Sequence, residues 1–255
     1  MSPTSREQIR SHWNQRAALG ERAGTQDLLA KQLERQALQE ACGAFWHDYP
    51  LRHVLEIGCG RGDTARELAM TLPDVQFLAL DNAAAMIAAA RTEGVGHNLQ
   101  FEVGDVAALP DVQFDLIYTQ RMLINLTTWE EQRLALDTIA DRLLPGGQYL
   151  MCENSQDGVD AINVERLKLG LEPIERPWHN RYLRDAELFD VTSLRLLRCV
   201  PFSSTYYFLS RVVNAALAHD EGLPPRYDAR INQLALQLPS VGPWAQGRLW
   251  IWEKP

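Results

Sequence analysis

Hydrophobic and polar positions follow two different periods in the middle of this chain. Short apolar runs that suit buried strands alternate with segments in which apolar residues recur every three or four positions, as in helices. The expected strands are 53–57, 75–80, 99–103, 114–119 and 145–153, and the expected helices are 63–71, 83–91 and 128–144. Short links between such elements predict right-handed crossovers and a mostly parallel sheet with helices on both faces.

Two helices are expected before the first strand. Thr4 and Glu7 have the spacing of a capping box, which predicts a helix that begins near residue 5 and ends within 20–24. The second expected helix covers residues 27–46. These two helices therefore come before the alternating strands and helices and are not part of that pattern.

After residue 153 the regular alternation weakens, although two further strands are expected at 193–200 and 248–254. We expect one domain with three parts. They are N-terminal helices (1–50), a cofactor-binding core (51–153) and an acceptor-binding part that contains the last strands (154–255).

Composition narrows the classes of protein. The 255 residues, 46% of them hydrophobic, are enough for a large core, and the net charge of -8 argues against a nucleic-acid partner. The four cysteines lack the spacing of a zinc site or a disulfide framework. The first residues lack the apolar segment of a signal peptide, and Asp81 and Asn82 interrupt the most apolar stretch. We therefore expect a cytoplasmic protein without a membrane span.

A glycine turn follows the first expected strand. Gly58 and Gly60 match the first two glycines of a dinucleotide-binding fingerprint, but Asp63 occupies the third position. Glu56 and Asp63 flank the turn and would repel a diphosphate. S-adenosylmethionine fits better, since its sulfonium and ammonium groups are cationic and glycine permits close approach of the backbone.

Acidic residues also follow the second and third expected strands. Asp81 is placed to accept hydrogen bonds from ribose hydroxyls, as acids do at this position in nucleotide-binding sheets. Asp105 is a candidate ligand of the adenine amino group, and Val106 offers its backbone N–H to the ring. Both aspartates are also good helix caps, and a cap does not exclude a ligand.

Five blocks in order, "VLEIGCGRGDT", "LALDNAAAMI", "FEVGDVAALP", "FDLIYTQRML" and "LLPGGQYLMCE", resemble the class I S-adenosylmethionine-dependent methyltransferases. The resemblance covers residues 53–153 and implies a Rossmann-like α/β fold with a seven-stranded sheet whose last strand is antiparallel. The expected cofactor contacts in these blocks are Glu56, Gly58, Cys59, Gly60, Asp81, Asn82, Met86, Gly104, Asp105, Val106 and Gln120.

The N-terminal "HWNQRA" is similar to the short tryptophan-containing helix that often closes over the cofactor in this family. Trp13 is then expected to cover the cofactor, and Arg16 to hold its carboxylate. Packing of Trp13 against the second helix is the alternative.

The acceptor pocket is expected in residues 153–183, after the fifth strand. His179 is our candidate general base, with Glu153 and Gln120 as further catalytic candidates, although His179 also suits a surface position. No metal triad is evident. The candidate acceptor-binding residues are Arg121, Asn154, Asn163, Arg166, Asn180, Tyr182 and Tyr206.

We therefore expect O-methylation of a saccharide or another polar small molecule. The block 153–183 loosely resembles bacterial methyltransferases that modify surface polysaccharides. Methylation of a nitrogen or a carboxylate is the alternative within this class. An NAD(P)-dependent oxidoreductase and an inactive binding protein are alternatives of other classes, and the sequence leaves the oligomeric state open.

Overall fold

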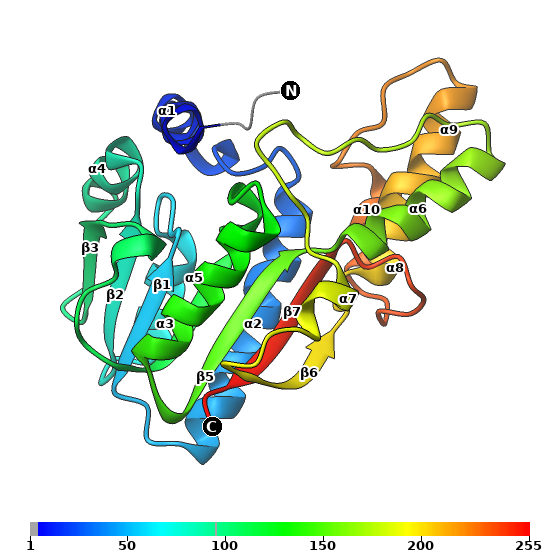
Figure 1. Ribbon diagram of the computed structural model, residues 1–255. Coiled ribbons are helices and arrows are strands. Elements are labelled where there is room, and N and C mark those ends of the chain that lie inside the picture. The colour runs from blue at the N-terminus through cyan, green and yellow to red at the C-terminus, as the bar shows by residue number, and fades with distance from the viewer. Residues whose placement is uncertain (1–4, 95) are drawn as a thin grey trace.

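The computed structural model describes residues 5–94 and 96–255, which build one seven-stranded sheet with helices on both faces (Figure 1). The strand order is β3-β2-β1-β4-β5-β7-β6, and β7 runs antiparallel to both of its neighbours. The strands are β1 (His53–Ile57), β2 (Gln76–Asp81), β3 (Leu99–Val103), β4 (Phe114–Gln120), β5 (Leu143–Asn154), β6 (Arg195–Val200) and β7 (Gly247–Glu253). The predicted fold class is confirmed.

Helices precede, connect and follow these strands. The longer ones are α1 (Arg6–Arg16), α2 (Leu28–Asp48), α3 (Asp63–Thr71), α4 (Ala84–Thr92), α5 (Trp129–Arg142) and α6 (Gln156–Lys168). The shorter ones are η1 (Ala17–Arg22), η2 (Val106–Ala108), η3 (Leu123–Asn125), α7 (Asp185–Leu188), α8 (Ser204–Phe208), the π-helical η4 (Leu209–Val213), α9 (Asn214–Asp220) and α10 (Arg230–Ala235). Among the described residues, no helix combines the length and hydrophobicity that a membrane span requires.

The capping box of α1 lies one residue later than predicted. Ser5 accepts a hydrogen bond from the backbone of Gln8, whose side chain accepts one from the backbone N–H of Ser5. Glu7 therefore lies in the first turn, and its predicted partner Thr4 lies outside the described residues.

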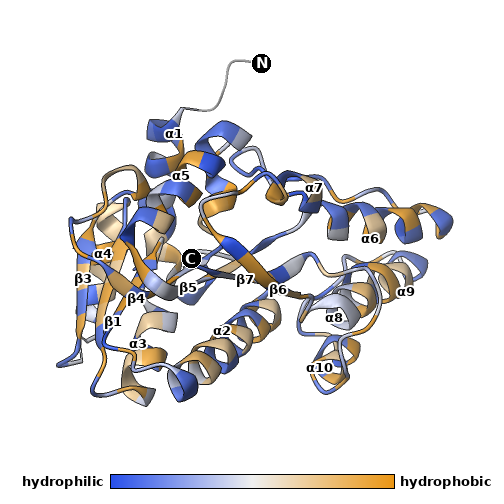
Figure 2. Cartoon of the chain, turned by 60° about the horizontal axis from the view of Figure 1, so that its bottom comes forward, coloured by the Kyte–Doolittle hydropathy of each residue, from blue (hydrophilic) through white to orange (hydrophobic). Residues whose placement is uncertain are grey.

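Hydrophobic cores form on both faces of the sheet. Leu38 of α2 packs on one face near Tyr118, and Leu136 of α5 packs on the other face near Trp250. β4 is buried along almost its whole length, as expected for a central parallel strand. Figure 2 shows hydrophobic positions along β7, which lies between β5 and β6.

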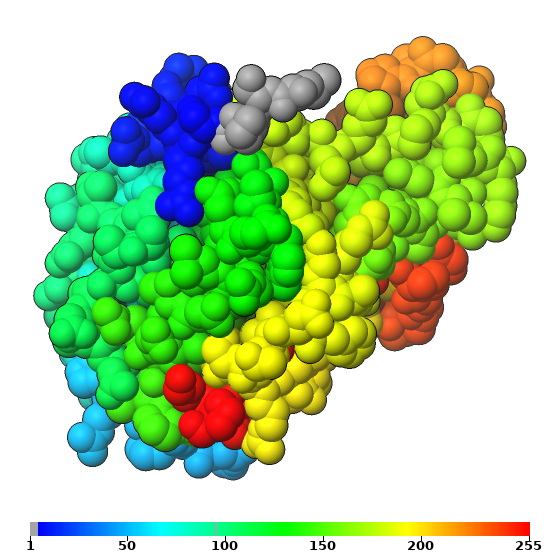
Figure 3. All heavy atoms as spheres, in the orientation of Figure 1, coloured from blue at the N-terminus to red at the C-terminus, as the bar shows by residue number. Residues whose placement is uncertain are grey.

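Helices α6, α8, α9 and α10 form a lobe beside the sheet, and α1 covers the top of the core (Figure 3). The lobe has its own hydrophobic cluster, which includes Ile162 and Val212 and reaches Ala30 of α2. Buried polar contacts join the same parts, because Asp27, the N-cap of α2, accepts a hydrogen bond from Tyr206 (2.6 Å) and pairs with Arg211 (2.5 Å). The lobe is therefore attached to the start of α2.

Gly158 of α6 lies against the backbone of the segment before β7. An added Cβ there would lie 2.0 Å from the carbonyl oxygen of Ala245, so we predict that Gly158→Ala lowers the free energy of unfolding by about 1–3 kcal/mol. Gly43→Ala is the matched control, because Gly43 is an exposed glycine inside α2 with open space at its Cβ position. This control should gain up to about 1 kcal/mol in urea unfolding. Equal effects of the two substitutions would contradict the packing described here.

Candidate active site

A large cavity opens at the carboxyl ends of β1, β2 and β4, with α1 and η1 above it. Its volume is about 1170 Å³, including the part open to solvent. This is the edge at which open α/β sheets bind ligands. The predicted contacts that line it are Trp13, Glu56, Gly58, Cys59, Gly60, Asp81, Asn82, Met86, Gly104, Asp105, Val106, Gln120 and Arg121.

The glycine turn after β1 directs its backbone N–H groups into the protein. Gly58 and Cys59 both donate to the carbonyl oxygen of Leu80 (2.7 and 2.9 Å), and Gly60 donates to the Asp81 carboxylate (2.8 Å). Gly58 has a φ of 79°, and a Cβ there would lie 2.4 Å from the side chain of Met122. The turn can therefore be approached closely, but these amides are not free to bind a phosphate.

Two buried acids, Glu56 and Asp81, lie at the floor of the cavity. Burial raises the pKa of Glu56 to about 8, although the Tyr118 hydroxyl donates to this carboxyl (3.0 Å). Burial also raises the pKa of Asp81, whose oxygens accept backbone N–H groups of Gly60 and Ala83. In the described part of the chain neither acid forms an ion pair, so a cationic ligand would supply the missing charge.

Asp81 and Asp105 also cap local structure. Asp81 accepts the N–H of Ala83 just before α4, and Asp105 is the N-cap of η2 and accepts the N–H of Ala107 (2.9 Å). Both nevertheless line the cavity. Asn82 donates to Asp105 across the cavity edge (3.3 Å), which places the ends of β2 and β3 together.

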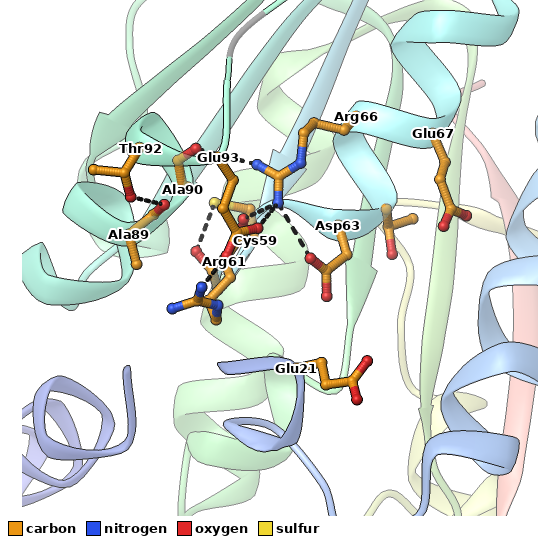
Figure 4. Close-up of polar contacts among 12 residues, drawn as sticks. Glu21, Cys59, Arg61, Asp63, Arg66, Glu67, Ala89, Ala90, Thr92 and Glu93 are labelled. Carbon is orange, nitrogen blue, oxygen red and sulfur yellow. Dashed lines mark hydrogen bonds and ion pairs between the residues drawn. The ribbon is translucent and has the colours of Figure 1, made fainter. Parts of the chain in front are cut away.

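Figure 4 shows the charged network at the cavity rim, where Arg66 reaches both Asp63 (3.2 Å) and Glu93 (2.7 Å). Arg61 pairs with Glu93, and Lys31 of α2 pairs with Asp63. Lys31 lines the cavity, which the sequence pattern did not indicate, because a lysine on an amphipathic helix usually faces solvent.

Arg16 does not line the cavity, and its expected contact with the cofactor carboxylate stays a prediction. Its guanidinium donates to the backbone carbonyl oxygens of Ala23 and Arg22 and so fixes the loop that follows η1. Trp13 does line the cavity, and its indole N–H donates to Asn125 (3.1 Å). Trp13 also packs in a small cluster with Met86 of α4, and this cluster includes no described residue of the second helix α2. Its expected role in covering the cofactor stays a prediction.

Gln120 and Arg121 at the end of β4 line the part of the cavity nearest α2. Thr64 donates to the amide oxygen of Gln120 (2.7 Å), whose amide nitrogen donates to Glu34 (2.7 Å). Arg121 pairs through Nε with Glu34 (3.0 Å) and donates from Nη1 to the carbonyl oxygen of Gly24 (3.0 Å). Nε of Arg121 forms no hydrogen bond with a described residue, so its contact with Glu34 is an ion pair only.

The structure gives Glu153 a different place from the one expected. Its carboxylate is buried and accepts backbone N–H groups of Met122 (3.0 Å), Leu123 (3.0 Å) and Ile124 (3.4 Å). Burial raises the pKa of Glu153 to about 7 in spite of these bonds. Glu153 therefore holds the turn after β4 and does not line the cavity.

His179 lies among aromatic rings under α1, outside the cavity lining. Its ring stacks on His12 with 4.5 Å between centroids, and Trp13 and Trp178 pack edge-on. Burial and the neighbouring His12 and Arg16 lower the pKa of His179 to about 4. The ring is neutral at pH 7, but the structure does not bring it to the cavity, so its catalytic role stays a prediction.

Most of the predicted acceptor contacts in the last third of the chain also lie outside the cavity lining. Asn163 binds both backbone groups of Ile174, and Arg166 donates to backbone carbonyl oxygens, one of them on Arg211. Tyr206 donates to Asp27. These polar groups hold the lobe together, which gives them a structural role.

Asn154, Asn180 and Tyr182 form a polar cluster near Arg121, in which Asn154 and Tyr182 are buried and Asn180 is half-buried. The side-chain oxygens of both asparagines lack a hydrogen-bond partner among the described residues. Arg121 therefore lies close to both this cluster and the cavity. No group of three or more potential metal ligands occurs in the described part of the chain, and Asp157 pairs with Arg184.

The raised pKa of Glu56 predicts a pH-dependent stability. The folded state keeps a proton that the unfolded state releases above pH 4.5, so this stabilisation is lost as pH rises toward about 8. Glu56→Gln should flatten the fall in unfolding free energy between these values by up to about 1.4 kcal/mol per pH unit. The exposed Glu40→Gln is the control. Identical pH slopes for wild type and Glu56→Gln in urea unfolding would contradict a buried, protonated Glu56.

Residues 54–147 match a family model described as a methyltransferase domain. The trans-aconitate 2-methyltransferase of Deinococcus radiodurans is 38% identical over 98 residues, which cover 38% of this chain and 36% of that enzyme. The match therefore spans about a third of the length of this curated relative.

Two solved structures match nearly the whole chain. One is magnesium protoporphyrin IX methyltransferase from Synechocystis PCC 6803 with bound S-adenosylhomocysteine (TM-score 0.64, 13% identity, 98% of this chain and 100% of that one). The other is the N-methyltransferase NodS from Bradyrhizobium japonicum with the same ligand (TM-score 0.59, 14% identity, 97% and 98%). At these identities the likeness is one of fold. Residues 54–147 thus match a methyltransferase domain, and the chain as a whole has the fold of these two methyltransferases.

Proposed function

We propose that this protein transfers a methyl group from S-adenosylmethionine to a carboxylate of a small organic acid. The choice of acceptor rests on Arg121, which lines the cavity and whose guanidinium donates one hydrogen bond within the described residues, from Nη1 to Gly24. Arginine pairs well with carboxylates through its planar N–H groups. Trans-aconitate 2-methyltransferases among the relatives support the same class of acceptor.

The cavity residues suit the cationic cofactor. Glu56 and Asp81 are buried acids without ion pairs in the described chain, and the amides of the glycine turn are already bonded. Both features favour positive charge over a diphosphate. Trp13 and Met86 line the same cavity from α1 and α4 and would exclude water from it.

A carboxylate acceptor explains why a general base need not reach the cavity. When bound, S-adenosylmethionine supplies a methyl group on a sulfonium, and transfer to a carboxylate leaves a neutral ester and a neutral thioether. A carboxylic acid is already ionised at neutral pH, so no proton has to be removed. Positioning of the acceptor by Arg121 and Gln120 then remains as the contribution of the protein.

Methylation of a saccharide hydroxyl remains a prediction from the sequence. It would require a base at the cavity, and the candidates His179 and Glu153 lie elsewhere. Three residues expected to bind a sugar, Asn163, Arg166 and Tyr206, are engaged in contacts within the lobe region. These contacts favour a carboxylate over a saccharide hydroxyl as the methyl acceptor.

The proposal is tested with labelled S-adenosylmethionine and a panel of di- and tricarboxylic acids, amines and sugar nucleotides. We expect a gain of one methyl group on an acid, as an ester that alkali cleaves. Arg121→Gln should raise KM for the acid by about tenfold or more, since a hydrogen bond to a charged group is lost, and should leave affinity for S-adenosylhomocysteine unchanged.

Arg6→Gln is the matched control, because Arg6 also lines the cavity but is half exposed and pairs with Glu131. It should change KM for the acid little. Methylation of amines or sugars in preference to acids would contradict the proposal, as would equal KM values for the two arginine variants.

A further inference from the structure

We propose that Glu34 of α2 is a positioning residue that fixes Gln120 and Arg121 for methyl transfer. This inference rests on the proposed function for the group that Arg121 binds. Glu34 itself does not line the cavity, and only 4% of its side chain is exposed. Any effect of Glu34 on the reaction must therefore pass through the two cavity residues that it contacts.

One oxygen atom of Glu34 serves both neighbours. Oε2 accepts from the amide nitrogen of Gln120 (2.7 Å) and lies 3.0 Å from Nε of Arg121. Two adjacent residues at the end of one strand are thus held by a single carboxylate on a helix 86 positions earlier in the sequence. The contact with Gln120 is a charge-assisted hydrogen bond, and the contact with Arg121 is an ion pair without a hydrogen bond from Nε.

The backbone at Arg121 is what allows this arrangement. Successive side chains of a strand point to opposite faces, so Gln120 and Arg121 would normally point apart. Arg121 has a φ of 53°, a conformation that no other described non-glycine residue adopts. Its N–H still donates to Cys152 of β5 (2.8 Å). A backbone held in this region costs roughly 1–3 kcal/mol and is often found at functional sites.

Thr64 fixes the other end of the Gln120 amide. Its hydroxyl donates to the amide oxygen of Gln120 (2.7 Å), which directs the amide nitrogen toward Glu34. Thr64 is the second residue of α3, directly after the glycine turn. The chain of contacts therefore runs from the cofactor turn through Gln120 and Glu34 to Arg121.

The geometry implies a division of roles between Glu34 and Arg121. Arg121 provides the positive charge, so its loss should weaken binding of an anionic acceptor. Glu34 orients that charge and the Gln120 amide, so its loss should slow the reaction of an acceptor that still binds. A small misplacement of reacting groups can cost up to about a hundredfold in rate.

The test is a double-mutant cycle of Glu34→Gln, Arg121→Gln and the double variant, with kcat, KM for the acid and affinity for S-adenosylhomocysteine. Glu34→Gln keeps the shape but removes the negative charge that Gln120 and Arg121 share. We expect it to lower kcat roughly ten- to hundredfold with KM for the acid nearly unchanged. The double variant should be no slower than the slower single variant, because the two residues act as one unit.

Two further variants separate positioning from folding. Glu34→Asp keeps the charge one methylene farther away and should retain more activity than Glu34→Gln; it also serves if Glu34→Gln does not fold. Glu67→Gln is the matched control, since Glu67 of α3 also pairs with a residue of α2, Arg35 (2.8 Å), but lies away from the cavity. It should leave kcat unchanged. Additive effects in the cycle, or a loss of S-adenosylhomocysteine affinity equal to the loss of kcat, would overturn the positioning role.

A crystal structure of Glu34→Gln with S-adenosylhomocysteine distinguishes failure of this inference from failure of the proposed function. We expect the Arg121 guanidinium to leave the Gly24 carbonyl. An unchanged Arg121 overturns the inference whatever the acceptor is. A displaced Arg121, together with wild-type protein that methylates no acid, rejects the carboxylate acceptor and leaves the positioning role standing.

Discussion

The turn between β1 and α3 uses its backbone N–H groups to hold β2, and the chemistry of the cavity depends on this constraint. Gly58, Cys59 and Gly60 donate to the Leu80 carbonyl and the Asp81 carboxylate, so the donors that would bind a phosphate are already bonded inside the protein. The groups that still face the cavity include two acids, Glu56 and Asp81. The same loop geometry that supports a diphosphate elsewhere therefore favours a cation here.

Helix α2 connects the floor of the cavity to the lobe. Asp27 and Glu34 are seven residues apart and share one face of the helix, and Lys31 lies between them. Asp27 binds Tyr206 and Arg211 of the lobe, Glu34 binds Gln120 and Arg121, and Lys31 pairs with Asp63. Buried charges left without a partner are strongly destabilising, so these contacts fix where α2 lies. The lobe and the cavity are thereby held by one helix.

The fold and the cofactor side could be predicted because they depend on local pattern. The strand expected at 193–200 is β6 (Arg195–Val200), and nearly all the expected cofactor contacts line one cavity, because parallel strands bring their carboxyl ends to one edge. Arg16 lies outside the cavity lining, and nothing in a sequence shows that a guanidinium will bind the carbonyl oxygens of its own loop. Glu34 was missed because a buried glutamate on a helix has the same local pattern as an exposed one. The acceptor side depends on such long-range contacts.

The central claim is that the acid-lined glycine turn accepts a cationic adenosyl cofactor and excludes a diphosphate. Calorimetric titration of the purified protein with S-adenosylmethionine, S-adenosylhomocysteine, NAD and NADP tests it most directly. The account predicts saturable binding of both adenosyl ligands and no heat of binding from either dinucleotide. Saturable binding of NAD or NADP would contradict this claim, as would the absence of a heat of binding with all four ligands.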